Sequence, residues 1–235
     1  MEQIFGAADW REVAATANSA FLLAFSSLFS IINPIGGALI FYGFTKDFSS
    51  LDRVKVAARV GFYSLLIMFG ALWFGTYILS FFGVSIDALR IGGGAVIALS
   101  GFRLLTTSES HPDQKRHERE VTPNSDDDPI QLAFFPLTLP FTTGPGTIAV
   151  ATTIGAEKPS HGAGLFAFFL GASVAALANA AIIWIGYRFA DRLTGLIGPT
   201  ARQVIVRLTA FLLMCIGVQI LVTAIGDLVA KWRVA

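Results

Sequence analysis

Ile32-Asn33-Pro34-Ile35-Gly36-Gly37 lies in the middle of an apolar run at residues 17–44. A proline inside a helix removes one backbone donor and clashes with the carbonyl four residues earlier, so one helix should end here and another should begin at Pro34. We expect Asn33 to cap the new helix. Backbone groups that such a break frees inside a bilayer must be satisfied by protein, water or a ligand. The break is therefore either a proline kink that neighbouring helices close or part of a binding site.

A second break of the same kind is predicted at Phe141-Thr142-Thr143-Gly144-Pro145-Gly146, where the proline follows Pro34 by 111 residues. This stretch also interrupts an apolar run, at residues 130–155. Thr142, Thr143 or Gly144 can cap a helix that begins at Pro145. Two breaks at corresponding places in the chain favour a binding site over a simple kink.

The composition indicates an all-α polytopic membrane protein. Of the 235 residues, 54% are hydrophobic, 14% are charged and 21 are phenylalanine. A helix needs about 20 apolar residues to cross a bilayer. The long stretches without charge predict six transmembrane helices, at residues 17–44, 57–82, 86–106, 129–155, 161–190 and 203–227. The first and fourth are the two that contain the breaks, and we expect both to be broken at mid-membrane.

The polar stretch at residues 106–128 divides the chain into two halves, 1–105 and 129–235, with three predicted helices each. Because three is an odd number, the halves would enter the membrane in opposite directions. The third helix of each half also begins alike, with Leu89-Arg90-Ile91 in the first and Val206-Arg207-Leu208 in the second. Together with the paired breaks, this pattern predicts two inverted three-helix repeats joined by a cytoplasmic linker.

Small residues at four-residue spacing predict close contacts between helices. Gly94 and Ala98 form such a surface on the third predicted helix, and Gly171 and Ala175 form another on the fifth. The second surface ends at Asn179, which either makes an interhelical hydrogen bond or belongs to the binding site. At the start of the third helix, we expect Asp87 and Arg90 to neutralise each other across one turn.

The two breaks predict a receptor for a small zwitterion. Half-helices that begin at Pro34 and Pro145 would point their N-termini, with free N–H groups and partial positive charge, at the membrane centre from opposite sides. An ammonium group could bind carbonyls of the preceding half-helices, and no charged side chain lies near the centre of any predicted span. The glycines allow close approach of the backbone to a small ligand. The candidate binding residues are Asn33, Pro34, Gly36, Gly37, Thr142, Thr143, Gly144, Pro145, Gly146 and Asn179.

At these residues the chain resembles the MarC family, also described as small neutral amino acid transporters. Asn33 to Gly36 is similar to the Asn-Pro-Ile-Gly of that family, and Pro136, Leu137 and Pro140 with Gly144 to Ile148 resemble its Pro-Leu-x-x-Pro and Gly-Pro-Gly-x-Ile. Gly37 and Thr143 depart from it, where the family often has asparagine and alanine. The resemblance covers nearly the whole chain and implies transport of small neutral amino acids across the bacterial inner membrane. The absence of charge near the membrane centre should exclude charged amino acids, and limited space should exclude large ones, so glycine, alanine and serine are the expected substrates.

Two other classes of function fit the sequence less well. A channel of the aquaporin kind also has inverted repeats with Asn-Pro at half-helix starts, but its half-helices are re-entrant loops additional to six spans, and both carry Asn-Pro-Ala. An enzyme is not expected, because Gly-x-Ser-x-Gly, His-Glu-x-x-His and paired intramembrane aspartates are missing. We expect no metal or cofactor and no nucleic-acid partner, since neither a ligand spacing nor a basic patch occurs.

The distribution of basic residues predicts the orientation. With both termini outside, twelve of the 17 Lys and Arg residues fall on the cytoplasmic side. Cytoplasmic loops carry the excess of Lys and Arg, so both the N-terminus and the C-terminus should be external. Aromatic residues near the span ends, Tyr187 among them, should lie in the interfacial belts.

Cysteine labelling tests this orientation. In a Cys215→Ser background, which removes the one native cysteine, Ser160→Cys should react with an impermeant thiol reagent in intact cells and Ser125→Cys should not. Labelling of both after permeabilisation is the control for reactivity. Labelling of position 125 but not 160 in intact cells would reverse the assignment.

Overall fold

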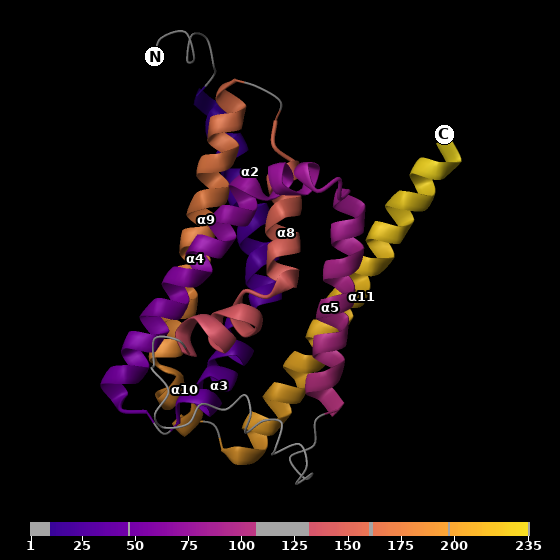
Figure 1. Ribbon diagram of the computed structural model, residues 1–235. Coiled ribbons are helices and arrows are strands. Elements are labelled where there is room, and N and C mark those ends of the chain that lie inside the picture. The colour runs from indigo at the N-terminus through magenta and orange to yellow at the C-terminus, as the bar shows by residue number, and fades with distance from the viewer. Residues whose placement is uncertain (1–9, 47, 107–131, 160–161, 197, 235) are drawn as a thin grey trace.

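The computed structural model describes residues 10–46, 48–106, 132–159, 162–196 and 198–234, and every regular element within them is helical (Figure 1). The predicted all-α fold is therefore confirmed. The polar linker was expected at residues 106–128; Thr106 is the last residue of α5, and the rest of the linker lies outside the described residues. In chain order the elements are α2 (Trp10–Ile32), α3 (Pro34–Thr45), α4 (Ser50–Phe81), α5 (Ile86–Thr106), η1 (Ala133–Thr142), α8 (Pro145–Ala156), α9 (Ala163–Arg188), α10 (Ala190–Leu196) and α11 (Pro199–Val234).

The helices form two groups with α8 between them. On one side α5 and α11 pack along each other, and on the other side α9 packs against both α2 and α4 (Figure 1). Helix α8 contacts α5 from the first group and α2 and α4 from the second. The N-terminal end of α8, where the second predicted break lies, therefore sits at the centre of the bundle.

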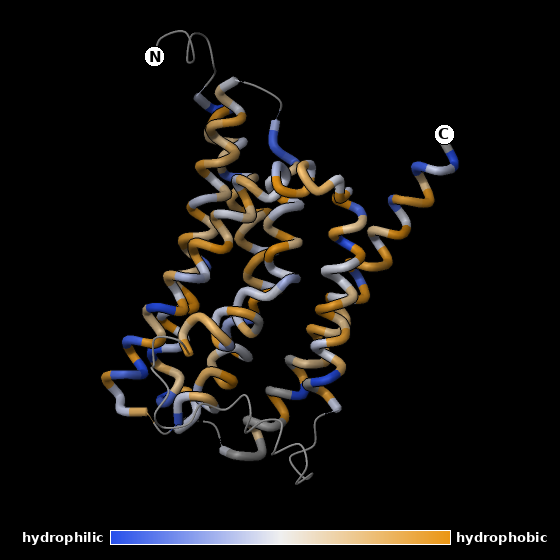
Figure 2. The backbone as a smooth tube through the Cα atoms, in the orientation of Figure 1, coloured by the Kyte–Doolittle hydropathy of each residue, from blue (hydrophilic) through white to orange (hydrophobic). Residues whose placement is uncertain are grey.

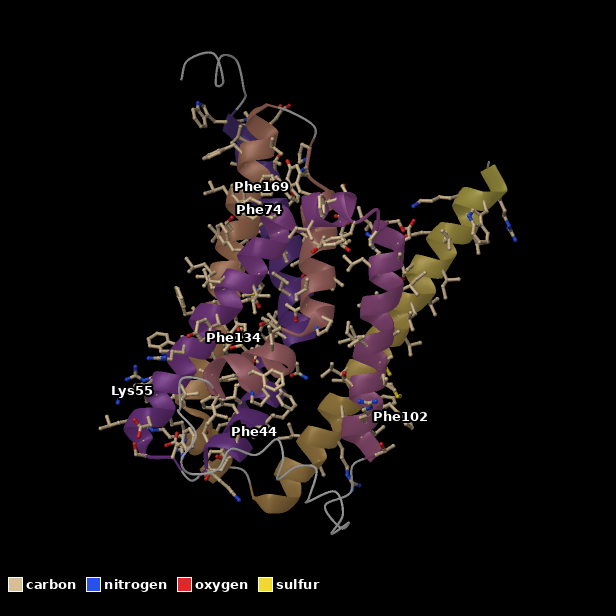
Figure 3. The ribbon with its side chains drawn as sticks, viewed as in Figure 1. Phe44, Lys55, Phe74, Phe102, Phe134 and Phe169 are labelled. Carbon is tan, nitrogen blue, oxygen red and sulfur yellow. The ribbon has the colours of Figure 1, made fainter. Side chains whose placement is uncertain are left out.

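The surface of the bundle suits a lipid environment. Among the described residues, four helical stretches are long and apolar enough to cross a membrane, namely Trp10–Thr45, Ser50–Phe81, Ala163–Arg188 and Ala210–Arg233. Hydrophobic residues dominate the lengths of the helices, and hydrophilic ones gather towards their ends (Figure 2). Large apolar side chains point outwards, including Phe74 on α4 and Phe102 on α5, which are both more than half exposed (Figure 3). A soluble monomer rarely exposes so much apolar surface, so the chain is a multi-pass membrane protein.

Several helices are longer than the predicted spans. Helix α2 begins at Trp10 rather than at 17, α4 at Ser50 rather than at 57, and α11 covers Pro199–Val234 rather than 203–227. The spans were predicted from apolar, charge-free residues, whereas a helix continues into the polar region until a cap ends it. At the start of α4 this cap is Ser49, whose hydroxyl accepts a hydrogen bond from the Asp52 N–H at 3.2 Å. The short helix α10 was not predicted.

At the first break, α2 ends at Ile32 and α3 begins at Pro34. Asn33 between them has φ 47° and ψ 69°, the left-handed conformation that asparagine tolerates better than most residues. Its side-chain oxygen accepts a hydrogen bond from the Gly36 N–H at 3.3 Å, which is the expected capping contact. One left-handed residue therefore interrupts the helix and satisfies one freed donor at once.

The second break is longer than predicted. The sequence indicated a helix up to about residue 141, but η1 has wide, irregular turns, and Phe135 and Leu139 adopt extended conformations with φ of −128° and −108°. Each of these residues precedes a proline, and a proline disfavours the helical conformation of the residue before it. Regular helix resumes only at Pro145, after Gly144 with φ −77° and ψ −175°.

Small residues allow α5 and α11 to touch backbone to backbone, as predicted for Gly94 and Ala98. A Cβ atom built on Gly217 would collide with the backbone nitrogen of Ala98, and it would lie 2.7 Å from the Gly94 carbonyl oxygen. A Cβ on Gly101 would lie 2.5 Å from the backbone nitrogen of Met214. No side chain other than hydrogen fits at these crossings, so the glycines set the distance between the two helices.

The predicted surface on α9 packs against α2. A Cβ on Gly171 would collide with the Ala17 carbonyl, so the two backbones are in contact there. Asn179 is fully buried, and its amide donates hydrogen bonds to the carbonyls of Ala175 at 2.9 Å and Phe25 on α2 at 3.4 Å. Of the two roles predicted for Asn179, the structure supplies the interhelical hydrogen bond.

Asp87 and Arg90 do not pair with each other as expected. Arg90 pairs with Asp227 at 3.3 Å and with Glu157 at 3.7 Å, whereas Asp87 pairs with Lys231. These partners come from α11 and from the residue that ends α8. Because α5 and α11 lie side by side, the opposite charge on the neighbouring helix is within reach, and the pairs connect helices rather than turns of one helix.

Substitution at the crossing of α5 and α11 tests the role of the glycines. Gly217→Ala should lower the free energy of unfolding by about 1–3 kcal/mol, because the new methyl group can be placed only by separating the two backbones. Gly226→Ala on the same helix is the matched control, since a Cβ there meets nothing within 4 Å. Thermal unfolding of the purified protein in detergent measures both. Equal melting temperatures for the two variants would contradict the close contact.

Candidate functional site

A cavity of about 250 Å³ lies at the N-terminal end of α8. We call it the α8 cavity. Its apolar wall comes from α2, α3, η1, α5 and α11 and consists of Ile31, Ile40, Val96, Ile97, Phe141 and Leu213. The remaining lining is polar or backbone-rich and consists of Ser100, Gly101, Thr142, Gly144, Pro145, Gly146 and Thr147. Cavities that hold drug-sized ligands usually measure about 300–1,000 Å³, so this one suits a smaller molecule.

The N-terminus of α8 has no side-chain cap. Gly144 is extended and carries no side chain, and Pro145 has no N–H to satisfy. The N–H groups of Gly146 and Thr147 have no hydrogen-bond acceptor among the described residues. Both residues line the cavity. Free N–H groups and the partial positive charge of a helix N-terminus bind anions, so this end of the cavity favours a carboxylate or a similar group.

Three hydroxyl groups line the same cavity. Ser100 donates to the Val96 carbonyl of its own helix at 2.7 Å. Thr142 donates to the Leu137 carbonyl at 2.6 Å. Thr147 is only 3% exposed, and its hydroxyl makes no hydrogen bond with a described residue. Because Thr147 lines the cavity and its hydroxyl has no partner among the described residues, this hydroxyl is available to a ligand.

The end of α2 has carbonyl groups that accept no hydrogen bond from a described residue. In a continuous helix the carbonyls of Ser30 and Ile31 would accept from residues 34 and 35, but Pro34 has no N–H and the left-handed Asn33 separates Ile31 from Ile35. Neither carbonyl therefore has a donor among the described residues. Ile31 lines the cavity. The end of α2, with these two carbonyls, therefore borders the cavity to which α8 contributes unsatisfied donors.

Four of the ten predicted binding residues line the α8 cavity: Thr142, Gly144, Pro145 and Gly146. The other six do not, namely Asn33, Pro34, Gly36, Gly37, Thr143 and Asn179. At the first break the Asn33 side chain already satisfies the Gly36 N–H, and the Gly37 N–H donates to the Asn33 carbonyl at 2.9 Å. The two breaks were expected to offer equivalent N-termini. At the first, the Asn33 side chain takes up the Gly36 N–H, and the Ile35 N–H is left without an acceptor among the described residues, whereas at the second the N–H groups of both Gly146 and Thr147 lack one.

Tyr187 covers the first break and was missed as a site residue. The sequence placed it in an interfacial belt, but it is 2% exposed and stacks on Phe41 of α3 with ring centroids 4.6 Å apart. Its hydroxyl lies 2.9 Å from the Thr142 hydroxyl, and a Cβ on Gly37 would lie 2.5 Å from the same oxygen. Tyr187 therefore joins α9 to both breaks. No periodicity in the sequence distinguishes it from an interfacial tyrosine.

Among the described residues, no Asp, Glu, Lys, Arg or His lines the α8 cavity. Its polarity comes from backbone groups and hydroxyls alone. A ligand that carries one positive and one negative charge could be held by the dipoles at the two walls, whereas a further charge would have no partner there. Burial of an unpaired charge is expensive, so the cavity selects against ligands with a net charge.

Comparison with known proteins gives one family. The family described as MarC family integral membrane protein matches residues 18–229. The UPF0056 inner membrane protein MarC of Citrobacter koseri is 31% identical over 213 residues, covering 88% of this chain and 94% of the relative. Proteins of the same name from Salmonella paratyphi A and Escherichia coli O1:K1 are 31% and 29% identical, with the same coverage. No solved structure matches.

The contact between Gly37 and Tyr187 can be tested by a double-mutant cycle. Gly37→Ala should destabilise the fold by about 1–3 kcal/mol, because the new methyl group meets the tyrosine oxygen. Tyr187→Phe removes that oxygen, so the double variant should be more stable than the sum of the single changes by about 0.5–3 kcal/mol. Gly43→Ala on the same helix, where a Cβ meets nothing within 4 Å, should have little effect. Additive changes in melting temperature would rule out the contact.

Proposed function

The chain belongs to the MarC family of integral membrane proteins, and from its fold and its cavity we propose that it is a secondary transporter of small neutral amino acids in the bacterial inner membrane. The observation that carries this proposal is the uncapped N-terminus of α8 in a small cavity without charged side chains. The relatives are called inner membrane proteins, which supports the location.

The proposed ligand is a zwitterion held by backbone dipoles. Its carboxylate would accept hydrogen bonds from the N–H groups of Gly146 and Thr147 and from the Thr147 hydroxyl. Its ammonium group would donate to the Ile31 carbonyl and to other carbonyls exposed at the breaks. A side chain no larger than a methyl or hydroxymethyl group would then lie against the apolar wall. Glycine, alanine and serine meet these conditions, whereas lysine and glutamate would bring in an unpaired charge.

Contacts between helices support the inverted repeat that we propose for the transport unit. The proposal pairs α2 with η1, α3 with α8, α4 with α9, and α5 with α11. If each helix is exchanged for its counterpart, every contact between two helices should have an equivalent contact between their counterparts. The contact of α2 with α9 is then equivalent to that of η1 with α4, and the contact of α3 with α9 to that of α8 with α4. The contact of α5 with α8 is equivalent to that of α11 with α3. All six of these contacts occur, and the pairs α4 with α9 and α5 with α11 map onto themselves.

Individual residues support the same pairing. Gly101 on α5 approaches Ala210 and Met214 on α11, and Gly217 on α11 approaches Gly94 and Ala98 on α5. The two sets of contacts are equivalent, because each residue of α5 corresponds to the residue of α11 that lies 116 positions later.

The second and fifth spans follow a similar rule. Trp73 and Gly75 on α4 correspond to Trp184 and Gly186 on α9, 111 residues later, the same separation as between the two prolines. Transporters built from inverted repeats bind their substrate near the bilayer midplane, where the repeats meet. The α8 cavity would then lie at mid-membrane, between the broken first and fourth of six spans.

The proposed orientation places both termini outside. Helix α2 begins and α11 ends at the same end of the bundle (Figure 1), whereas Lys55 lies at the opposite end (Figure 3). Among the described residues, most Lys and Arg belong to elements at that opposite end, which the positive-inside rule assigns to the cytoplasm.

A carrier is favoured over an aquaporin-like channel by the wall of the α8 cavity. Ile97 is 4% exposed and lies against Gly146, so closely that a Cβ on the glycine would collide with the Ile97 side chain. This contact separates the α8 cavity from a second cavity nearer the termini. A channel needs a continuous path, whereas a carrier must close one side of its site.

Amino acids should stabilise the purified protein selectively. At 100 times its dissociation constant a ligand adds about 2.7 kcal/mol to the stability of the folded state, so glycine, alanine and serine should raise the melting temperature. Lysine and glutamate should not, because their extra charge has no partner. Equal stabilisation by glutamate and glycine would contradict the charge argument. No response to any amino acid, combined with rapid water flux in vesicles, would favour the channel.

The Thr147 hydroxyl should contribute to binding. Thr147→Val keeps the shape and removes the hydroxyl, so it should weaken glycine binding by about 1–3 kcal/mol, roughly 5- to 150-fold, without loss of the fold. Ser26→Ala is the control, because that hydroxyl bonds to the Leu22 carbonyl of its own helix and lines neither cavity. Counterflow of labelled glycine in proteoliposomes measures both. Unchanged affinity in Thr147→Val would place the substrate elsewhere.

A further inference from the structure

We propose that the chain has a second binding site for the same zwitterionic amino acids, in a cavity that contains Arg90 and Glu157; this inference rests on the transport function proposed above. The cavity measures about 210 Å³ and lies between α2, α5, α8 and α11. We call it the Arg90 cavity. Its polar lining consists of Ser27, Arg90, Thr153, Glu157, Gln219 and Thr223. Unlike the α8 cavity, it contains one side chain of each charge.

Arg90 is held in place by a residue that does not line the cavity. Its Nη1 atom donates to Asp227 on α11 at 3.3 Å, and its side chain is 26% exposed. Lys231 and Asp87 pair one turn further along the same two helices. The guanidinium is therefore fixed between α5 and α11 by contacts that do not involve Glu157.

Glu157 is bound only loosely. Its Oε1 atom lies 3.7 Å from Nη2 of Arg90, which is longer than a hydrogen bond, and Arg90 is its only ion partner among the described residues. Its side chain is 49% exposed. A partly solvated pair at this distance contributes little to stability, so separating it costs little.

A zwitterion can replace this pair without leaving any charge unpaired. The ligand carboxylate would accept hydrogen bonds from the Arg90 guanidinium, whose planar donors suit a carboxylate. The ligand ammonium would donate to the Glu157 carboxylate. Because both ligand charges lie on one carbon atom, they fit between two side chains that are already near each other. A simple anion or cation would satisfy one side chain and repel the other.

Neutral groups deeper in the cavity also lack partners. The Thr153 hydroxyl is buried and makes no hydrogen bond with any described residue. Ser27, a partly exposed residue that lines the same cavity, has no side-chain hydrogen bond in the described part of the chain. A buried polar atom without a partner is uncommon in a native structure and points to a missing ligand or water. The Gln219 side chain donates to the Thr223 hydroxyl, one turn further along α11, at 3.2 Å. A small amino acid in this cavity could satisfy Thr153 and Ser27 while its charges pair with Arg90 and Glu157.

The two cavities share one lining residue, Ile97. It lies on α5 between Gly94, which lines the Arg90 cavity, and Gly101, which lines the α8 cavity. Its side chain rests on the bare α-carbon of Gly146. The Ile97 side chain therefore separates an amino acid in the Arg90 cavity from the α8 cavity. Movement of this side chain away from Gly146 would join the two sites.

Glycine stoichiometry in the purified full-length protein tests this inference. Equilibrium binding of radiolabelled glycine should give two molecules per chain. Glu157→Gln should keep one, with the affinity of the other site reduced about tenfold or more, because it removes the partner of the ammonium group. Asp87→Asn is the matched control: it removes a carboxylate from the same end of the protein, outside the cavity, and should keep both. Thr147→Val should keep the site at Arg90.

The outcomes separate the two proposals. One glycine per chain in the wild type, unchanged in Glu157→Gln, would overturn the second site and leave the transport function standing. No glycine bound to the wild type would overturn both. If Glu157→Gln does not fold, Thr153→Val replaces it, and two unchanged affinities in that variant would overturn the second site. Acetate and glycinamide, which each carry one of the two charges, should not compete for this site, and competition by either as strong as by unlabelled glycine would also overturn it.

Discussion

The need to satisfy every backbone N–H and C=O group away from water governs this fold. A continuous helix meets that need by itself, and most of the described chain is continuous helix. Proline cannot donate, so Pro34 and Pro145 each force the chain to find another arrangement in the middle of an apolar run. Both arrangements place a residue outside the helical conformation, a left-handed Asn33 in the first half and an extended Gly144 in the second. The site described above consists of what these two breaks leave unsatisfied.

The two breaks solve the same problem differently. At the first, an asparagine side chain reaches the Gly36 N–H, and Tyr187 fills the space beside Gly37. At the second, Gly144 has no side chain to offer, so the first N–H groups of α8 remain available in a cavity. The half of the chain that lacks a cap is therefore the half that offers donors to a ligand. A difference of one side chain, asparagine against glycine, accounts for this asymmetry.

Glycines bring the helices into close contact around the cavities. Gly101 and Gly217 bring α5 and α11 into backbone contact, and ion pairs at one end hold the same helices together. Gly146 plays a different part, because its missing side chain makes room for Ile97. Since α5 carries both Ile97 and Arg90, a shift of this helix would change the wall of one cavity and the charged pair of the other together. The packing thus links the two cavities mechanically.

Local chemistry in the sequence was enough to determine the helical membrane fold, the start of a helix at Pro34 and at Pro145, and the close contacts of Gly94 and Gly171. Each depends on neighbouring residues along the chain, through the missing N–H of proline or the missing side chain of glycine. The extended Phe135 and Leu139 follow the same kind of local rule, because each of them precedes a proline.

Only the tertiary structure decided which partners Arg90 takes and where Tyr187 lies. These depend on side chains from helices far apart in the sequence that meet only when the bundle forms. The sequence around a tyrosine near a helix end does not indicate whether its side chain faces lipid or a glycine on a neighbouring helix. An arginine likewise has an acidic residue within one turn of its own helix and another across the interface, and the distance between the packed helices determines which of them it reaches.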